Sequence, residues 1–199
     1  MIRNVVFDMG NVILDFSAQR YLDTWVEAEE DKALLMRELF DSIEWEMTDH
    51  GTLDNKGLYS AVCTRVPQRL HAAVGNIIAH WWEDMPVLPG MEELIHGLLE
   101  EGYRLSVLSN VGEYHSLLQP KIPHIERFSG VFFSSQWKML KPEVEIYRTF
   151  CAHFGLVPDE CLFIDDRKDN AYGAQRIGMH GLAYHGQPEE IKEALNALR

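Results

Sequence analysis

The segment IRNVVFDMGN (residues 2–11) opens the chain with an apolar run that ends at Asp8. A short run rich in β-branched and aromatic residues, bounded by a turn signal, is typical of a buried strand. Asp8 ends the run and is followed at once by Met9-Gly10-Asn11. We therefore expect residues 2–7 to form a fully buried strand. A carboxylate at the end of such a strand, as at Asp8, is a candidate nucleophile or metal ligand.

From residue 91 onward the pattern alternates between helix and strand. Strands are predicted at residues 103–108, 130–134, 161–164 and 180–184. Amphipathic helices precede Gly102, Gly155 and Gly178, which can end helices in a left-handed conformation. Strands that alternate with helices of this length indicate βαβ units, and hence a parallel sheet covered on both faces. The sequence thus predicts an α/β fold with a Rossmann-like, three-layer core.

Residues 17–82 have a helical pattern, because their apolar residues recur three and four positions apart. Ser17 and Asp54 are candidate N-caps in this stretch, and Pro86 and Pro89-Gly90 mark its end. We expect a small all-α unit inserted after the first strand, with the core at residues 1–15 plus 87–199 and the helical insert at residues 16–86. Four tryptophans are expected mostly in the core of this insert rather than around a sugar ring: Trp25, Trp45, Trp81 and Trp82.

The formal net charge of −13 argues against a nucleic-acid groove or an anionic membrane surface, because clustered Lys and Arg bind both. It is compatible with a small anionic substrate, since a metal ion and one or two cations can reverse the local potential. Three cysteines without metal-ligand spacing predict reduced thiols of a cytosolic protein. We expect neither a signal peptide nor a membrane span, and a cytoplasmic monomer or homodimer.

Polar clusters end two further predicted strands. Ser109-Asn110 follows residues 103–108, and Asp165-Asp166 follows residues 161–164. The carboxyl ends of parallel strands share one edge of the sheet, where ligands bind at the point at which strand order reverses. We therefore expect Asp8 to meet both clusters there, although they are far apart in the sequence.

This set of residues permits phosphoryl transfer. A carboxylate such as Asp8 can attack phosphorus to give an aspartyl phosphate. Because nucleophile and substrate are both anionic, the reaction needs a divalent cation and a fixed positive charge. Asp8, one or both acids of the Asp165-Asp166 pair and a main-chain carbonyl near Gly10 would form the oxygen-rich shell that Mg²⁺ prefers. Lys141 supplies the fixed positive charge.

Donors for the phosphate oxygens are also present, in the Ser109 hydroxyl and the Asn110 backbone N–H. Taken singly, these clusters have structural explanations: Ser109-Asn110 suits a turn or helix cap, and Lys141-Pro142 suits the start of a helix. The adjacent like charges of Asp165-Asp166 are harder to explain without a nearby cation. The ordered set favours a functional site.

The order Asp8, Ser109, Lys141, Asp165-Asp166 resembles the four motifs of the haloacid dehalogenase superfamily of phosphohydrolases. The helical stretch directly after the first motif resembles members with a helical cap of the first type. The phrase FDMGNV (residues 7–12) is similar to bacterial sugar-phosphate phosphatases, including those that act on glucose 1-phosphate. The resemblance implies that Asp8 is nucleophile and metal ligand, that the acid pair holds magnesium, and that the phosphoryl group is bound by Ser109, Asn110 and Lys141.

Within the acid pair, the resemblance favours Asp166 as the direct ligand, supported by Asn170 one helical turn later. Asp165 is then a second or outer ligand, and Asp169 competes with Asn170 for the supporting role. These assignments stay open at the level of the sequence.

The sequence departs from the family at Gly10, where most such phosphatases carry a second Asp that acts as general acid and base. Loss of such a group typically slows a reaction by about 10²- to 10⁴-fold. Asp15 is one candidate substitute, although it suits a helix-leading cap equally well. Asp49 and His50 are others, because the loop at Gly51 could bend into the site and His50 titrates in the useful pH range.

We therefore expect a Mg²⁺-dependent phosphatase that acts on a small phosphorylated metabolite, in particular a sugar phosphate. One alternative is a metal-binding but catalytically weak regulatory protein of the same fold. Another is a haloacid-type dehalogenase, since those enzymes also lack the second Asp but need no metal.

Overall fold

The structure, a computed structural model, describes residues 1–198 and has a parallel β-sheet at its centre. Within these residues the sheet has five strands in the order β3-β2-β1-β4-β5. The strands are β1 (Asn4–Phe7), β2 (Arg104–Ser109), β3 (Gly130–Phe133), β4 (Cys161–Asp165) and β5 (His180–Ala183). All four neighbouring pairs are parallel. The predicted α/β fold is confirmed.

The strands β2 and β4 each extend one residue farther than the sequence predicts. Ser109 still pairs with Phe133, and Asp165 still pairs with Ala183. Ser109 and Asp165 are therefore the last residues of their strands and are held by strand pairing, whereas the sequence predicts them in the loops after the strands.

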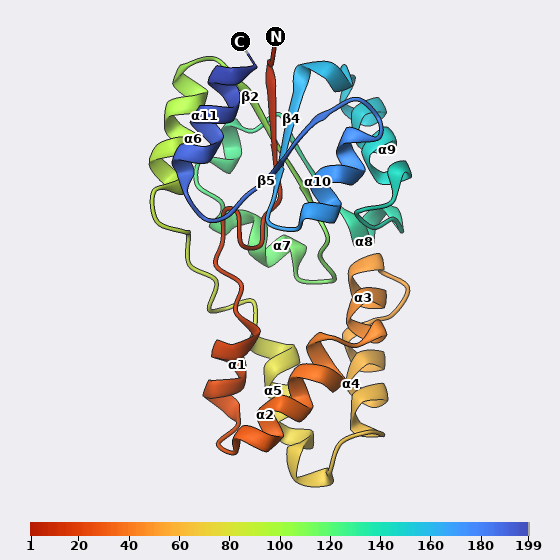
Figure 1. Cartoon of the computed structure of the whole chain (residues 1–199). Coiled ribbons are helices and arrows are strands. Elements are labelled where there is room, and N and C mark those ends of the chain that lie inside the picture. The colour runs from red at the N-terminus through yellow and green to blue at the C-terminus, as the bar shows by residue number, and fades with distance from the viewer. Residues whose placement is uncertain (199) are drawn as a thin grey trace.

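Helices cover both faces of the sheet (Figure 1). Successive side chains of a strand point to opposite faces, and so Val5 and Phe7 join one apolar cluster while Val6 joins the other. The first cluster includes buried residues of α6 (Met91–Glu100), α7 (His115–Leu118) and α11 (Pro188–Ala197). The second includes buried residues of α9 (Val144–Phe154) and α10 (Lys168–Gln175). This is the predicted three-layer core.

The stretch predicted to be helical forms a separate set of helices at the carboxyl ends of the strands (Figure 1). They are α1 (Ala18–Trp25), α2 (Glu29–Leu35), a π-helical turn (Met36–Phe40), α3 (Ile43–His50), α4 (Asn55–Cys63), a 3-10 turn (Gln68–Leu70) and α5 (His71–His80). Ser17 accepts a hydrogen bond from Arg20 N at 3.2 Å and Asp54 accepts one from Gly57 N at 2.7 Å. Both predicted N-caps are confirmed. The domain boundaries stay a prediction.

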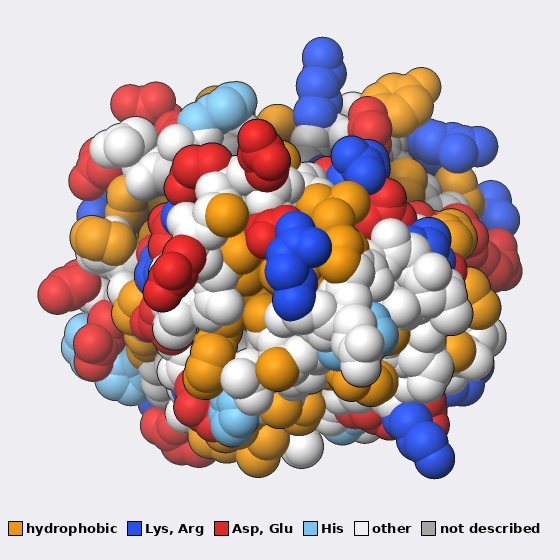
Figure 2. Space-filling model, turned by 90° about the horizontal axis from the view of Figure 1, so that it is seen from below, with side chains coloured by type: hydrophobic (Ala, Val, Ile, Leu, Met, Phe, Trp, Pro, Cys, Tyr) orange, Lys and Arg blue, Asp and Glu red, His pale blue; other side chains and the backbone are white. Residues whose placement is uncertain are grey.

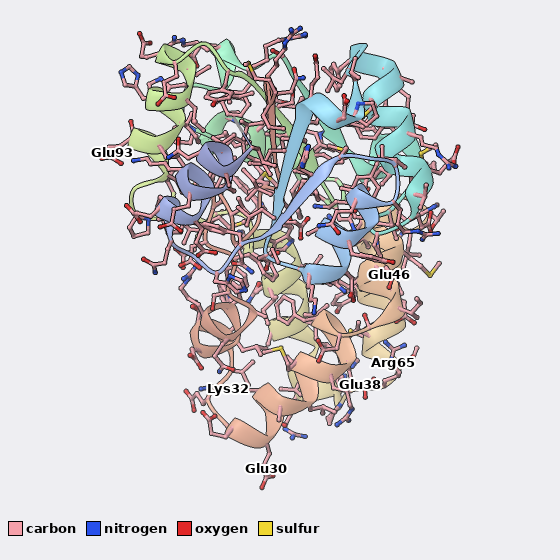
Figure 3. The ribbon with its side chains drawn as sticks, turned by 45° about the horizontal axis from the view of Figure 1, so that its top comes forward. Glu30, Lys32, Glu38, Glu46, Arg65 and Glu93 are labelled. Atoms are coloured by element: carbon pink, nitrogen blue, oxygen red, sulfur yellow. The ribbon has the colours of Figure 1, made fainter. Side chains whose placement is uncertain are left out.

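This helical insert has its own apolar cluster, which includes Leu22, Leu39, Val62 and Ile77. On its surface Arg65 forms ion pairs with Glu38 at 2.8 Å and with Glu44 at 2.9 Å (Figure 3). On the face seen in Figure 2, Lys and Arg side chains lie scattered among acidic and apolar ones.

Two extended segments connect the insert to the core. Asp15 N donates a hydrogen bond to Pro86 O at 2.8 Å, and Leu88 N donates to Ile13 O at 2.8 Å. Because the outgoing and returning segments pair with each other, the insert is attached directly at the edge of the sheet where Asp8 lies.

The remaining short elements are α8 (Ser134–Trp137) and 3-10 turns at Gln119–Lys121, Ile125–Arg127 and Pro158–Glu160. The three cysteines are free thiols, as predicted. Among the described residues, no helix combines the length and apolar character needed to cross a lipid bilayer.

Candidate active site

Three carboxylates converge where the order of the strands reverses. β1 lies between β2 and β4, so the chain turns to opposite sides of β1 at this point. Open α/β sheets bind their ligands at such a position. Asp8 directly follows β1, and Asp165 and Asp166 come from the end of β4. Each of the three offers a carboxylate oxygen, and these oxygens all lie within 4.8 Å of one another.

Lys141 is buried between two of these acids. Its Nζ lies 2.9 Å from Asp8 Oδ1 and 2.7 Å from Asp165 Oδ2. Burial alone lowers the pKa of Lys141, but the two carboxylates outweigh this effect and the pKa lies above its ordinary value. Lys141 therefore stays charged at neutral pH. One ammonium beside three acids leaves an excess of negative charge, which a divalent cation would neutralise.

Burial raises the pKa of Asp8 to about 7, although the Lys141 ammonium opposes the shift. The neighbouring Asp165 carboxylate adds to it, and a hydrogen bond from Ser109 opposes it. Met9 N also donates to Asp8 Oδ1 at 2.7 Å. Burial, and then the charge of Asp165, raise the pKa of Asp166 as well. Both shifts report carboxylates that lack enough positive charge around them.

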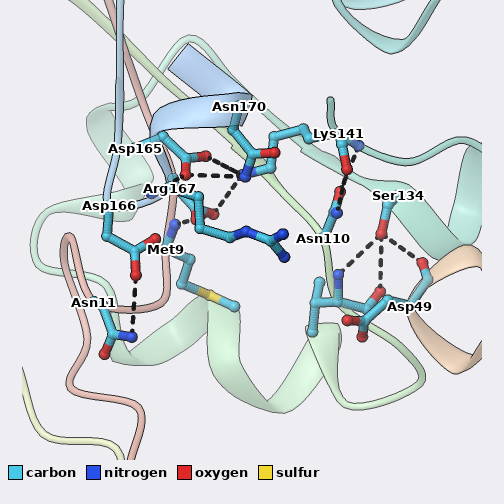
Figure 4. A network of polar contacts seen from close by, with 12 residues as sticks. Met9, Asn11, Asp49, Asn110, Ser134, Lys141, Asp165, Asp166, Arg167 and Asn170 are labelled. Atoms are coloured by element: carbon cyan, nitrogen blue, oxygen red, sulfur yellow. Dashed lines mark hydrogen bonds and ion pairs between the residues drawn. The ribbon is translucent and has the colours of Figure 1, made fainter. Parts of the chain in front are cut away.

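The two acids of the pair have different surroundings (Figure 4). Asp165 is fully buried, and besides Lys141 its oxygens accept hydrogen bonds from Arg167 N at 2.9 Å and from Asn170 Nδ2 at 2.9 and 3.1 Å. Asp166 is exposed and accepts a bond from Asn11 Nδ2 at 3.2 Å. Asp166 therefore keeps more oxygen lone pairs available to a ligand than Asp165 does.

The donor set fits a hydrated magnesium ion. Magnesium prefers oxygen ligands and retains several water molecules. Asp8, Asp166 and Gly10 line one cavity, which gives two carboxylates and a main-chain carbonyl. Asn170 lines the same cavity, and its buried Oδ1 has no hydrogen-bond partner among the described residues. A water bound to the metal would satisfy it, whereas Asp169 is exposed and lies outside the cavity lining.

Asn110 holds the main chain of Lys141 with its side chain. Its Nδ2 donates to Lys141 O at 3.1 Å, and its Oδ1 accepts from Lys141 N at 3.0 Å (Figure 4). The amide is thus engaged in positioning Lys141, and the backbone N–H is the group of Asn110 that could meet a phosphate. Ser109 and Asn110 both line the cavity.

The sequence interpretation missed two polar residues that the core contributes to the lining, Asn11 and Arg167. Asn11 adopts a left-handed conformation (φ 56°). Its side chain accepts a hydrogen bond from Phe16 N at 3.1 Å and donates one to Asp166. Its signal was the Gly-Asn pair, since Asn tolerates this conformation. Arg167 also lines the cavity. Its position next to the acid pair was the only hint.

The cavity has a volume of about 540 Å³ and lies between the sheet edge and the helical insert. We use the term aromatic wall for the four aromatic residues that the helical insert contributes to the lining: Phe16, Phe40, Trp45 and Trp81. Their rings pack together, with centroids 4.9 Å apart for Phe40 and Trp45 and 5.7 Å apart for Trp45 and Trp81. The insert adds polar residues to the lining: Asp41, Ser42, Glu46 and Asp49.

The prediction for the tryptophans was incomplete. Trp45 and Trp81 pack against the apolar cluster of the insert and also line the cavity. Trp25 is 41% exposed and stacks on His80, and Trp82 packs against Tyr114. One side of a bundle side chain can be core while the other forms a cavity wall, which helical periodicity cannot distinguish.

The structure distinguishes among the three candidates for the missing general acid and base by their positions relative to the cavity. Asp49 lines the cavity. Asp15 forms an ion pair with Arg20 at 2.8 Å and lies outside the lining. His50 also lies outside it, and its Nδ1 is buried without a partner among the described residues. The structure therefore brings Asp49 to the site and does not bring Asp15 or His50 there.

Comparison with known proteins gives a family match over most of the chain. The model of the haloacid dehalogenase-like hydrolases matches residues 2–178. Flavin mononucleotide hydrolase 1 of Arabidopsis thaliana is 30% identical over 106 residues, which are 53% of this chain and 43% of that protein. The sesquiterpene phosphatase astK of Aspergillus oryzae is 25% identical over 185 residues, 89% of this chain and 87% of the relative.

Solved structures show the same fold. A variant of a HAD family enzyme from Bacteroides thetaiotaomicron, in complex with magnesium and inorganic phosphate, superposes with a TM-score of 0.72 at 19% identity and covers 94% of this chain and 95% of that one. The similarity also extends to dehalogenases: the (S)-2-haloacid dehalogenase 4A of Burkholderia cepacia is 22% identical over 213 residues, 99% of this chain and 92% of the relative.

Proposed function

This chain belongs to the haloacid dehalogenase-like hydrolase family, and we propose that it is a magnesium-dependent phosphatase that acts on a small phosphorylated metabolite. The observation that carries the proposal is the buried contact of Lys141 with Asp8 and Asp165, next to the exposed Asp166. It combines a nucleophile, a fixed cation and an acidic site for a divalent ion in one cavity.

The nucleophile is Asp8. One of its carboxylate oxygens attacks the phosphorus atom, and an aspartyl phosphate forms as the ester bond breaks. Lys141 orients Asp8 and balances charge on the transferred group. The Ser109 hydroxyl and the Asn110 N–H donate hydrogen bonds to phosphate oxygens.

Magnesium would be held by Asp8, Asp166 and the Gly10 carbonyl, with Asp165 and Asn170 behind them. When bound, it supplies positive charge that lets the anionic nucleophile approach an anionic phosphate. Asp165 keeps Lys141 in place, since its own oxygens are already occupied by hydrogen bonds.

The substrate we propose is a monophosphate with an uncharged body, such as a sugar phosphate. The aromatic wall offers apolar surface to a ring, and Asp41, Ser42 and Glu46 offer acceptors to hydroxyl groups. The cations of the cavity lining, Lys141 and Arg167, both come from the core. A second anionic group in the body of the substrate would therefore meet carboxylates of the insert. On this proposal residues 16–86 act as a cap that selects the substrate.

Hydrolysis of p-nitrophenyl phosphate by the purified protein tests the chemistry. We expect turnover with Mg²⁺, loss of turnover with EDTA, and loss in Asp8→Asn. Equal activity in Asp8→Asn would refute the covalent route. A panel of sugar phosphates, with flavin mononucleotide and a sesquiterpene phosphate added because relatives carry those names, then ranks substrates.

A haloacid-type dehalogenase is the second candidate, and Gly10 together with the similarity to the Burkholderia enzyme favours it. The acidic cluster of Asp8, Asp165 and Asp166 favours the phosphatase, because carbon–halogen hydrolysis needs no metal. Halide release from a 2-haloacid in the presence of EDTA would establish the dehalogenase. Mg²⁺ binding with neither activity would establish a regulatory protein.

A further inference from the structure

Phosphomonoester hydrolysis leaves one proton unassigned in the site described so far. When the ester bond breaks, the leaving oxygen needs a proton, and the water that attacks next must lose one. Position 10 is a glycine and can do neither. An additional group must therefore reach the cavity from elsewhere in the chain, close to the attack position at Asp8.

The last turn of α3 brings Asp49 to this cavity. The main-chain carbonyl of Asp49 accepts a hydrogen bond from Ser134 Oγ at 2.5 Å (Figure 4). Ser134 Oγ also accepts a bond from Val111 N at 2.9 Å, and Val111 lies in the cavity lining. One hydroxyl of the core thus connects the insert to the loop that follows β2.

Two glycines allow this close approach. A Cβ at Gly112 would lie 3.1 Å from Thr48 O, which is tighter than most such contacts. Gly51 ends α3 in a left-handed conformation (φ 77°) and packs against the main chain of Ser135, where a side chain would be strained. Lys138 Nζ donates to Gly51 O. The turn that carries Asp49 is therefore in contact with four residues of the core: Gly112, Ser134, Ser135 and Lys138.

The surroundings of Asp49 suit a group that both gives and takes a proton. Burial raises its pKa to about 7. The backbone N–H of Gly112 and the Lys141 ammonium lower the pKa, whereas the charges of Asp8 and Glu46 raise it. A group with a pKa near the working pH is populated in both forms.

Other acids of the insert fit this role less well. Asp41 and Glu46 line the cavity but are exposed to solvent; Glu46 lies on α3 where the insert meets the core (Figure 3). Within residues 1–198, Asp49 is the acid of the insert that lines the cavity and is mostly shielded from water.

We propose that Asp49, supplied by the insert, is the general acid and base of this site in place of residue 10. This inference rests on the proposed phosphatase function. In the first step Asp8 bonds to phosphorus, the ester P–O bond breaks, and its electron pair takes the proton of the Asp49 carboxyl to release an alcohol. In the second step the Asp49 carboxylate removes a proton from water, the water oxygen bonds to phosphorus, and the electron pair of the broken bond returns to Asp8.

Asp49→Asn, assayed as the Mg²⁺-loaded protein, tests the assignment. With an alkyl phosphate we expect kcat to fall about 10²- to 10⁴-fold with KM little changed, because the leaving alkoxide is strongly basic. With p-nitrophenyl phosphate the leaving group needs no proton, and only the second step suffers. We therefore expect a burst of one p-nitrophenolate per protein and a phosphorylated Asp8. Unchanged kcat with the alkyl phosphate would overturn the proposal.

A second variant protects the test against a folding defect. A Cβ at Gly10 would meet only Phe16 Cβ, at an ordinary 3.8 Å, and so Gly10→Asp fits the cavity. Adding Gly10→Asp to Asp49→Asn should restore turnover of the alkyl phosphate. Glu44→Gln, on the same helix but paired with Arg65 outside the cavity lining, should match wild type. Loss of the burst together with failure of the double variant would give residue 49 a structural role and overturn the proposal. A wild-type protein without phosphatase activity would instead refute the proposed function.

Discussion

Asn110 and Lys141 exchange two hydrogen bonds, at 3.0 and 3.1 Å, between the amide side chain of one and the main chain of the other. The amide makes two hydrogen bonds to the main chain of Lys141, as a neighbouring strand would. These bonds hold Lys141 beside Asp8 at the end of β1. The position of the site cation thus depends on a residue that directly follows β2.

Asn110→Asp should disturb this arrangement while conserving shape. The second carboxylate oxygen would face Lys141 O without a proton between them, and the unpaired carbonyl costs about 1–3 kcal/mol. We expect a lower melting temperature and a reduced kcat with unchanged Mg²⁺ affinity. Calorimetry and kinetics check this, with Asn196→Asp on the exposed side of α11 as the matched control.

Lys141→Met should leave Asp8 and Asp165 buried without their cation. Removing one partner of a buried ion pair costs about 3–5 kcal/mol. Lys141 lowers the pKa of Asp8, so in the variant Asp8 holds its proton to higher pH. A raised carboxyl pKa in the folded state means that stability falls as pH rises. The stability lost on substitution of Lys141 should therefore be larger at pH 8 than at pH 5. Urea denaturation without metal measures it, with Lys192→Met as control; a loss independent of pH would contradict the explanation.

Asp166→Asn and Asp165→Asn should have different effects. Asp166 accepts a hydrogen bond from Asn11, and its replacement should weaken Mg²⁺ binding with little change in the stability of the metal-free protein. Asp165 holds Lys141, Arg167 N and Asn170, and its replacement should destabilise the fold without metal. Saturation at about 100 times Kd stabilises a protein by about 2.7 kcal/mol. Thermal melts with and without Mg²⁺ separate the two effects, and the reverse pattern would exchange the two roles.

Trp45→Leu should impair substrate binding through the aromatic wall. The residue lines the cavity and its ring packs on Phe40 and Trp81. Loss of aromatic contacts of this kind costs about 0.5–1.5 kcal/mol beyond burial, so we expect KM for the best substrate to rise up to about tenfold. Trp25→Leu, outside the cavity lining, is the control. An equal effect of both variants would point to the stability of the insert instead.

Asp49→Asn should also change how stability depends on pH. Burial raises the pKa of Asp49 to about 7, so the folded state favours the protonated carboxyl. Folding stability therefore decreases as pH rises from about 4 to about 7. One pKa unit corresponds to about 1.4 kcal/mol, and partial solvent exposure reduces this, so we expect the variant to be about 1–2 kcal/mol more stable than wild type at pH 8. At pH 4 the free energies of unfolding of the variant and of wild type should be equal. Denaturation without metal measures both.

The strand pattern, and the polar residues at the strand ends, could be recognised from the sequence because both are local. Asp8 and Asp165 are placed by the strands they end, and parallel strands carry their carboxyl ends to one edge wherever they lie in the sheet. The expectation that residues 8, 109 and 165 share one edge of the sheet therefore needed only the alternation of helix and strand, whereas their meeting depends on β2 and β4 lying on either side of β1. The helix caps Ser17 and Asp54 were readable for the same reason, since a cap acts on the next turn of its own helix.

What the tertiary structure decided depends on contacts between distant segments. Asp15, Asp49 and His50 were equivalent as acid or base candidates in the sequence, and the docking of α3 onto Ser134 and Gly112 brings only Asp49 of the three to the cavity. The double role of Trp45 follows from the same docking. Side-chain periodicity describes one helix at a time, whereas the distance between an insert and a core is set by steric fit and hydrogen bonds across the interface. Local sequence therefore determined the residues at the strand ends, and packing between the insert and the core determined which residue of the insert joins them.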